Sequence, residues 1–276
     1  MKFCYQVATP DVAIAPSVTS YQGALEKSFQ DIAALGYDQA ELMTVDPDKL
    51  DWTDVKKLAE KYNLTIPLIC TGEVYGQLGI SFVDPDPARQ KIALDRMRRI
   101  IDFASFLGAN VNVGRIRGQY TTGIPRQATY AAAVAAFRQI STYAAEKNVM
   151  IALETINTLQ SNFINTMAEG AAFVDTVGHP NFRLMADVFH MNMEEKDICR
   201  SIKDYAAYII YVHLSDSNRR YPGSAGLNFQ KVIQAFQASG YDGTFSVEVM
   251  QVPDQKTSAQ KSMECLKPIF AQIYGG

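Results

Sequence analysis

The chain has 276 residues, of which 47% are hydrophobic and 20% are charged, and its formal net charge is −3 at pH 7. These values are typical of a globular protein with one large core, and a parallel α/β barrel of about 250 residues is a common solution at this length. The slightly acidic balance provides no overall basic surplus for binding nucleic acid, so no nucleic-acid partner is expected.

The N-terminal residues lack the uninterrupted apolar core of a signal peptide, because Gln6, Thr9, Pro10 and Asp11 break it. The longest purely apolar run, 131–137, is far too short to span a membrane. The four cysteines are scattered and form no C-x-x-C pair, which favours reduced thiols over a disulfide framework or a thiolate zinc site. We therefore expect a cytoplasmic protein without a membrane segment.

Strand-like and helix-like patterns alternate along the first half of the chain. Between residues 71 and 87 the pattern lapses: three glycines and two prolines occur without clear periodicity, which predicts a long loop forming a partial lid over the functional site. Strands are predicted at 2–8, 37–43 (ending near Glu41), 64–70 and 110–113, and helices between Ser20 and Gly36 and at 51–62 and 88–107.

The second half continues the same alternation. Strands are predicted at 149–153, 182–186, 208–212 and 244–247, and helices at 127–147, 165–177, 198–205, 228–238 and 258–273. Eight strand-then-helix units follow one another with no linker, charge block or low-complexity tract. This pattern predicts an α/β fold, a single (β/α)8 TIM barrel, as one domain covering residues 1–276.

Each of the last four predicted strands ends in a side chain that can bind a metal. These residues are Glu154, Asp187, His213 and Glu248, separated by 33, 26 and 35 residues. Each interval is close to one strand–helix unit, and the C-terminal ends of barrel strands meet at one face. A buried carboxylate or imidazole is costly unless something binds it, so we expect the four to share a ligand.

Three carboxylates and one imidazole form a mixed oxygen and nitrogen donor set without thiolates. Such a set suits Mn²⁺, Mg²⁺, Co²⁺ or Zn²⁺. Without a cation the clustered carboxylates would repel one another and their pKa values would rise. We therefore predict one bound divalent metal ion, with Mn²⁺ favoured.

Several segments around these residues resemble the xylose-isomerase-like barrel superfamily of sugar isomerases and epimerases, with ketose 3-epimerases as a close branch. The likeness spans nearly the whole chain and is strongest after residue 150. The segments that carry it are 152–157, 187–190, 212–219, 222–226 and 240–248, together with 81–89 and the end of the long helix at 107–109.

The resemblance implies that Glu154, Asp187, His213 and Glu248 are the metal ligands. It also implies that Glu154 and Glu248 act as acid/base catalysts on opposite faces of a sugar. A divalent ion chelated by a carbonyl and a neighbouring hydroxyl acidifies the adjacent C–H and stabilises an enediolate. One carboxylate removes the proton, and the second returns one to the opposite face (epimerisation) or to the adjacent carbon (isomerisation).

The resemblance also implies that His190 and Arg219 contact the substrate. Asp216 fits a capping role better than a fifth ligand. One departure concerns the position six residues after the first ligand, where ketose 3-epimerases commonly carry a glutamate and this chain has Gln160. Glutamine keeps the hydrogen-bonding capacity but loses the charge. The arginines at 115 and 117 could bind a phosphate or carboxylate, although a solvated loop is the favoured interpretation.

Three other functions compete with a sugar isomerase or epimerase. A metal-dependent dehydratase of an inosose-type or hydroxy-keto substrate could use the same enediolate. A non-catalytic sugar-binding barrel is also compatible with the fold. An abasic-site DNA endonuclease of the superfamily binds three zinc ions through several more histidines, whereas this chain has three, and His179 is expected at the opposite end of the barrel. The predicted partner is a sugar or sugar-like molecule, phosphorylated or not, and the resemblance implies a homo-oligomer, dimer or tetramer.

Overall fold

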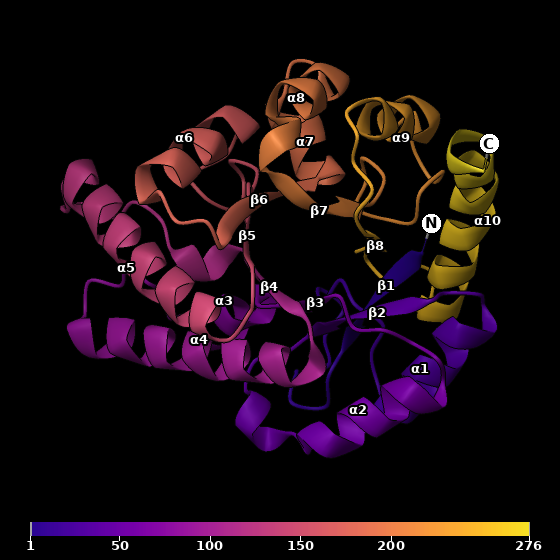
Figure 1. The fold of residues 1–276 in the computed structure, drawn as a ribbon, viewed down its shortest axis with the longest axis horizontal. Coiled ribbons are helices and arrows are strands. Elements are labelled where there is room, and N and C mark those ends of the chain that lie inside the picture. Colours follow the sequence, from indigo (N-terminus) through magenta and orange to yellow (C-terminus); the bar gives the residue numbers. More distant parts are fainter. Residues whose placement is uncertain (1, 276) are drawn as a thin grey trace.

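Eight parallel strands form a closed barrel in sequence order, surrounded by helices, in the computed structural model, which describes residues 2–275 (Figure 1). The barrel closes where β8 pairs with β1, with Phe245 opposite Phe3. The predicted (β/α)8 architecture is confirmed. The strands are β1 (Phe3–Ala8), β2 (Gln39–Met43), β3 (Leu68–Cys70), β4 (Asn110–Val113), β5 (Ile151–Glu154), β6 (Phe182–Asp187), β7 (Ile209–Leu214) and β8 (Phe245–Val247).

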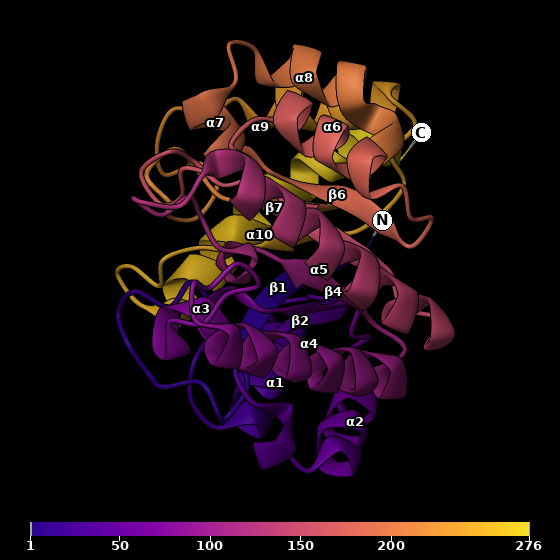
Figure 2. The same ribbon diagram turned by 90° about the vertical axis from the view of Figure 1, so that its left-hand side faces the viewer.

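The described chain contains ten α-helices and three short 3-10 helices besides the strands. Figure 2 shows the two short helices α3 and α7 on the same side of the barrel, beyond the C-terminal ends of the strands. The helices are α1 (Leu25–Ala34), η1 (Pro47–Lys49), α2 (Trp52–Lys61), α3 (Gly72–Leu78), α4 (Pro87–Leu107), η2 (Arg115–Arg117), α5 (Arg126–Glu146), α6 (Met167–Val177), α7 (Val188–Glu194), α8 (Ile198–Tyr205), η3 (Ala206–Tyr208), α9 (Phe229–Ala238) and α10 (Gln255–Tyr274).

The main core lies between the barrel and the helices. Helix α9 illustrates how the sequence produces it: Phe229, Val232, Ile233 and Phe236 recur at helical spacing and are all buried. The side chain of Asn228 accepts a hydrogen bond from the Lys231 N–H and so caps the first turn. Burying one such apolar side chain contributes about 1.5–3 kcal/mol, which fixes the helix against the strands.

Two helices were not predicted from the sequence. The segment 71–87 is not a loop throughout, because Gly72–Leu78 forms α3, and its two glycines hide the helical signal. Helix α7 begins directly after Asp187, whose Oδ1 accepts hydrogen bonds from the backbone N–H groups of Phe189 (2.8 Å) and His190 (3.3 Å).

Smaller features also bear on the predictions. Strand β3 is shorter than the predicted 64–70, and Pro67 has no N–H to donate to a neighbouring strand. All four cysteines are free thiols, two buried and two half-buried. Within residues 2–275, no helix combines the length and the hydropathy that crossing a lipid bilayer requires.

Candidate metal centre and active site

The four predicted ligand residues meet at the C-terminal face of the barrel. One ligand atom from each lies within 4.8 Å of the others, and all four side chains are buried. Glu154 and Asp187 end β5 and β6, His213 lies near the end of β7, and Glu248 follows β8 directly. Asp187 and His213 are paired in register, so the barrel itself sets their separation. This group is a candidate site for one metal ion.

The orientation of His213 fits a metal ligand. Its Nε2 lies 2.9 Å from both carboxylate oxygens of Glu41, so Nδ1 faces the cluster. Nδ1 is 2.9 Å from Glu248 Oε2 and 3.7 Å from both Glu154 Oε1 and Asp187 Oδ2, yet it is buried and makes no hydrogen bond within the described chain. Burial opposes a charge on His213, but Glu41 and Glu248 outweigh burial and raise its pKa well above the usual value. The surroundings therefore favour positive charge here.

Glu41 supports the candidate ligand group through its contact with His213, and no role was predicted for it from the sequence. It is fully buried within β2, and its Oε1 accepts a hydrogen bond of 2.8 Å from Gln6. Gln6 in turn accepts one of 2.7 Å from the Ser20 hydroxyl. A carboxylate that holds the far nitrogen of a metal-binding histidine fixes the tautomer and the ring orientation. The one available signal was a glutamate inside a strand that is otherwise largely apolar.

Arg219 lies against two of the candidate ligands. Its guanidinium donates to Asp187 Oδ2 at 2.6 Å and to Glu248 Oε2, and it stacks 4.9 Å from the ring centre of Phe189. Burial opposes ionisation of Glu248, but Arg219 and His213 outweigh burial and hold its pKa at about 2. Burial also opposes ionisation of Asp187, but the positive charge of Arg219 outweighs burial, and the pKa of Asp187 lies well below its usual value.

Glu154 and His190 lie side by side at the opposite edge of the ligand group. Burial raises the pKa of Glu154, and Asn112 Nδ2 lies 3.2 Å from its Oε2. His190 Nδ1 is 2.7 Å from the side-chain amide nitrogen of Asn157. Nδ1 therefore accepts a hydrogen bond, and in the neutral ring the proton is on Nε2. Nε2 points toward Glu154 Oε1, 3.8 Å away. Burial lowers the pKa of His190 to about 4, which leaves the ring neutral.

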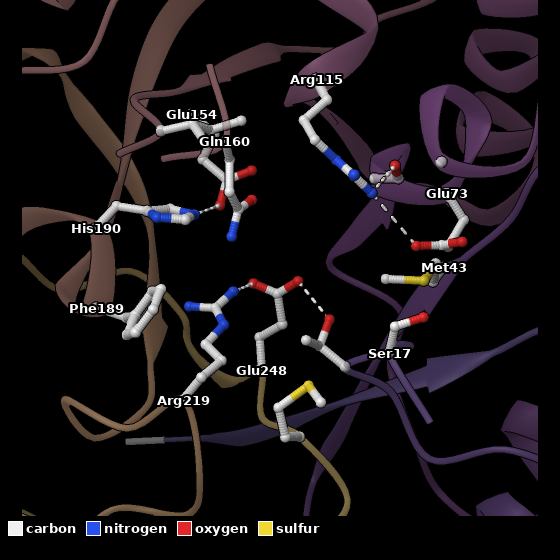
Figure 3. A pocket seen from close by; sticks show the side chains of 15 residues that line it. Ser17, Met43, Glu73, Arg115, Glu154, Gln160, Phe189, His190, Arg219 and Glu248 are labelled. Atoms are coloured by element: carbon white, nitrogen blue, oxygen red, sulfur yellow. Dashed lines mark hydrogen bonds and ion pairs between the residues drawn. The ribbon is translucent and has the colours of Figure 1, made fainter. Parts of the chain in front are cut away.

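A cavity of about 450 Å³ opens above the ligand group (Figure 3). Glu154 and Glu248 line it, and so do the predicted substrate-contacting residues His190 and Arg219. Asp187 and His213 are fully buried behind this wall. A molecule in the cavity would therefore meet the two glutamates directly, whereas the other two ligands could act only through the metal.

The other side of the cavity contains two more charged side chains. Arg115 from η2 and Glu73 from α3 lie with their nearest charged atoms 3.4 Å apart, whereas Gln160, from the loop after β5, lies next to Glu154 (Figure 3). Arg115 is therefore not a solvated loop residue, as the sequence had favoured, but part of the cavity wall. Part of the segment 71–87 borders the site, because Gly72, Glu73 and Gly76 of helix α3 line the cavity.

Arg117 has neither of the roles considered from the sequence. It is fully buried, and its guanidinium donates to the backbone carbonyls of Gly114, Glu154, Phe163 and Ile164 at 2.7–3.1 Å. Burial lowers its pKa to about 10, so it still carries a charge at neutral pH. This arginine ties the loop after β4 to the loop after β5.

Asp216 and His179 lie where they were expected. Asp216 is buried and accepts hydrogen bonds from the backbone N–H groups of Ser217, Gly223, Ala225 and Leu227, which organises the loop after β7. His179 lies between α6 and β6, at the other end of the barrel from the ligand group. Neither side chain belongs to the candidate metal site.

Comparison with known proteins defines the class of this barrel. Residues 29–269 match the family described as Xylose isomerase-like TIM barrel. The chain therefore belongs to this family, as the resemblance predicted.

Its relatives are sugar epimerases. The chain is 32% identical over 241 residues to an L-ribulose 3-epimerase from Methylomonas sp. (strain DH-1), covering 84% of this chain and 81% of that protein. It is 28% identical over 222 residues to a ketose 3-epimerase from Arthrobacter globiformis, covering 78% and 74%. The crystal structure of a D-allulose 3-epimerase from Methylomonas sp. in complex with D-allulose superposes with a TM-score of 0.81 at 25% identity, covering 97% of this chain and 96% of that one.

Proposed function

We propose that the protein is a metal-dependent ketose epimerase that inverts the carbon next to the carbonyl, C3 of a 2-ketose. The observation that supports this proposal is that only two of the four candidate ligands face the cavity. Glu154, at the end of β5, and Glu248, directly after β8, line the cavity, while the other two ligands are buried behind them. Inversion requires one proton-transferring group on each face of the reacting carbon, and two cavity-facing carboxylates supply them.

A divalent ion held by Glu154, Asp187, His213 and Glu248, Mn²⁺ by preference, would polarise the carbonyl and the neighbouring hydroxyl of the sugar. The protein's own side chains supply the remaining interactions. The Nε2–H of neutral His190 would donate to a substrate oxygen at the cavity wall. The guanidinium of Arg219 would stabilise the negative charge that develops on the sugar oxygens.

The proton transfers divide between the two glutamates. In one direction Glu248 takes the proton from C3 and the bond electrons pass to the carbonyl oxygen. Glu154 then gives a proton to the opposite face of C3 as the carbonyl re-forms. The reverse reaction exchanges the two roles. Each turnover moves one proton from Glu154 to the sugar and one from the sugar to Glu248, and proton exchange with solvent restores both carboxyl groups before the next turnover in the same direction.

Deuterium incorporation tests this function directly. The protein is stripped of metal, reloaded with Mn²⁺ and incubated in D₂O with a panel of free ketoses. We expect the C3 epimer to form with one deuterium at C3, and the chelated protein to be inactive. Loss of water detected by mass would instead identify a dehydratase. Binding of a sugar without any exchange would identify a non-catalytic sugar-binding barrel.

A further inference from the structure

We propose that Glu73 and Arg115 are a specificity-determining pair. They would bind hydroxyl groups at the end of the sugar that lies away from the metal ligands, and Glu73 would exclude substrates that carry an anion at that end. This inference rests on the proposed function, since it assumes that the reacting end of a sugar lies at the two catalytic glutamates.

The position of the pair points to this role. Figure 3 shows Arg115 and Glu73 across the cavity from Arg219 and Phe189. Arg115 Nη2 lies 3.2 Å from the Gly72 carbonyl oxygen and 3.4 Å from Glu73 Oε1. The side chains are 31% and 13% exposed respectively, so both are partly withdrawn from solvent but still open to the cavity.

The charges of the pair favour a neutral ligand. The charges of Arg115 and Glu73 compensate each other, and Ser17, which Figure 3 shows on the same side of the cavity, is uncharged. A sugar hydroxyl can donate to the carboxylate and accept from the guanidinium at the same time. A phosphate or carboxylate that approached Arg115 would come close to Glu73, and like charges at such short range repel strongly.

Gly76 shows that α3 leaves space for this pair. A Cβ atom at position 76 would lie 3.0 Å from Arg115 Nη2 and 3.0 Å from Glu73 Oε2. Glycine is unfavourable in the middle of a helix. Its place in α3 is explained by the two charged groups, which pack against its Cα.

The experiment compares one sugar with and without a charge at its far end. A panel of ketoses is assayed for C3 exchange both as free sugars and as their terminal phosphate esters, and the Kd of both forms is measured by calorimetry on the Mn²⁺-loaded protein. We expect the wild type to prefer the free sugar by about tenfold or more. Glu73→Gln keeps the shape but frees Arg115, so the ratio should move about tenfold or more toward the phosphate ester. In the double variant Glu73→Gln/Arg115→Met this gain should disappear.

Glu60→Gln is the matched control, because it makes the same change in net charge on the exposed surface of α2 and should leave the ratio unchanged. A wild type that prefers the phosphate ester, or a Glu73→Gln variant with an unchanged ratio, would overturn the inference. Failure of the proposed function gives a different result, in which neither form of any ketose exchanges its C3 hydrogen in any variant. In that case the Kd ratios still decide whether the pair selects against anions.

Discussion

The two sides of the cavity are built differently. The metal side consists of Glu154, Asp187, His213 and Glu248, which stand on or directly after β5–β8 and are all buried. The far side includes Glu73 and Arg115, which stand on a short helix and a 3-10 turn. The barrel register fixes the first set, whereas the second set depends on segments inserted after the strands. We infer that the barrel strands position the groups that react and that the inserted segments select the substrate.

Removing either of the two carboxylates that we propose as acid/base catalysts should have the largest effect. Glu154→Gln and Glu248→Gln should each lower kcat by about 10²–10⁴-fold, because general acid/base catalysis contributes that much. C3 deuterium exchange measures the loss, while circular dichroism and metal content show that the barrel and the ion remain. Glu60→Gln, the same change on the exposed surface of α2, serves as the control and should leave kcat unchanged. A metal-loaded Glu154→Gln variant with normal turnover would refute the assignment and the division between the two sides.

The metal side could be predicted from the sequence because of how a parallel barrel is built. All strand ends emerge at one face, so ligand-type residues one strand–helix unit apart must converge. Glu41 could not be assigned in this way, because it lies inside β2 and only the closed barrel brings it to His213. Glu73 was hidden by the glycines of α3. Arg117 lies in a predicted loop, and its sequence gives no sign of burial. Most of the backbone carbonyls that bind its guanidinium are 37–47 residues away in sequence, and only that of Gly114 is nearby.

Glu41 tests whether the metal side depends on support from outside the ligand set. Glu41→Gln removes the charge that holds the Nε2–H of His213, so metal affinity should fall by about 10–100-fold. Competition with a chelating dye measures the affinity, and the melting temperature of the metal-free protein reports on the fold separately. With saturating metal, turnover should largely recover. If the affinity were unchanged while the protein lost stability, Glu41 would be a core residue and not a positioning residue.

The smallest expected effect distinguishes two glycines of α3. Gly76→Ala should raise KM for the sugar by about twofold to tenfold, the value of one hydrogen bond, because the new Cβ displaces Arg115 or Glu73. Metal affinity should not change, because α3 contributes nothing to the ligand group. Gly72→Ala is the matched control: its Cβ would meet Cys70 Sγ at 3.6 Å and Met43 Cε at 3.8 Å, which are ordinary contacts. Alanine favours the helix at both positions, so a rise in KM for Gly76→Ala alone cannot come from unfolding of α3. Equal KM values for the two variants would mean that the far side adjusts freely and that α3 does not select the substrate.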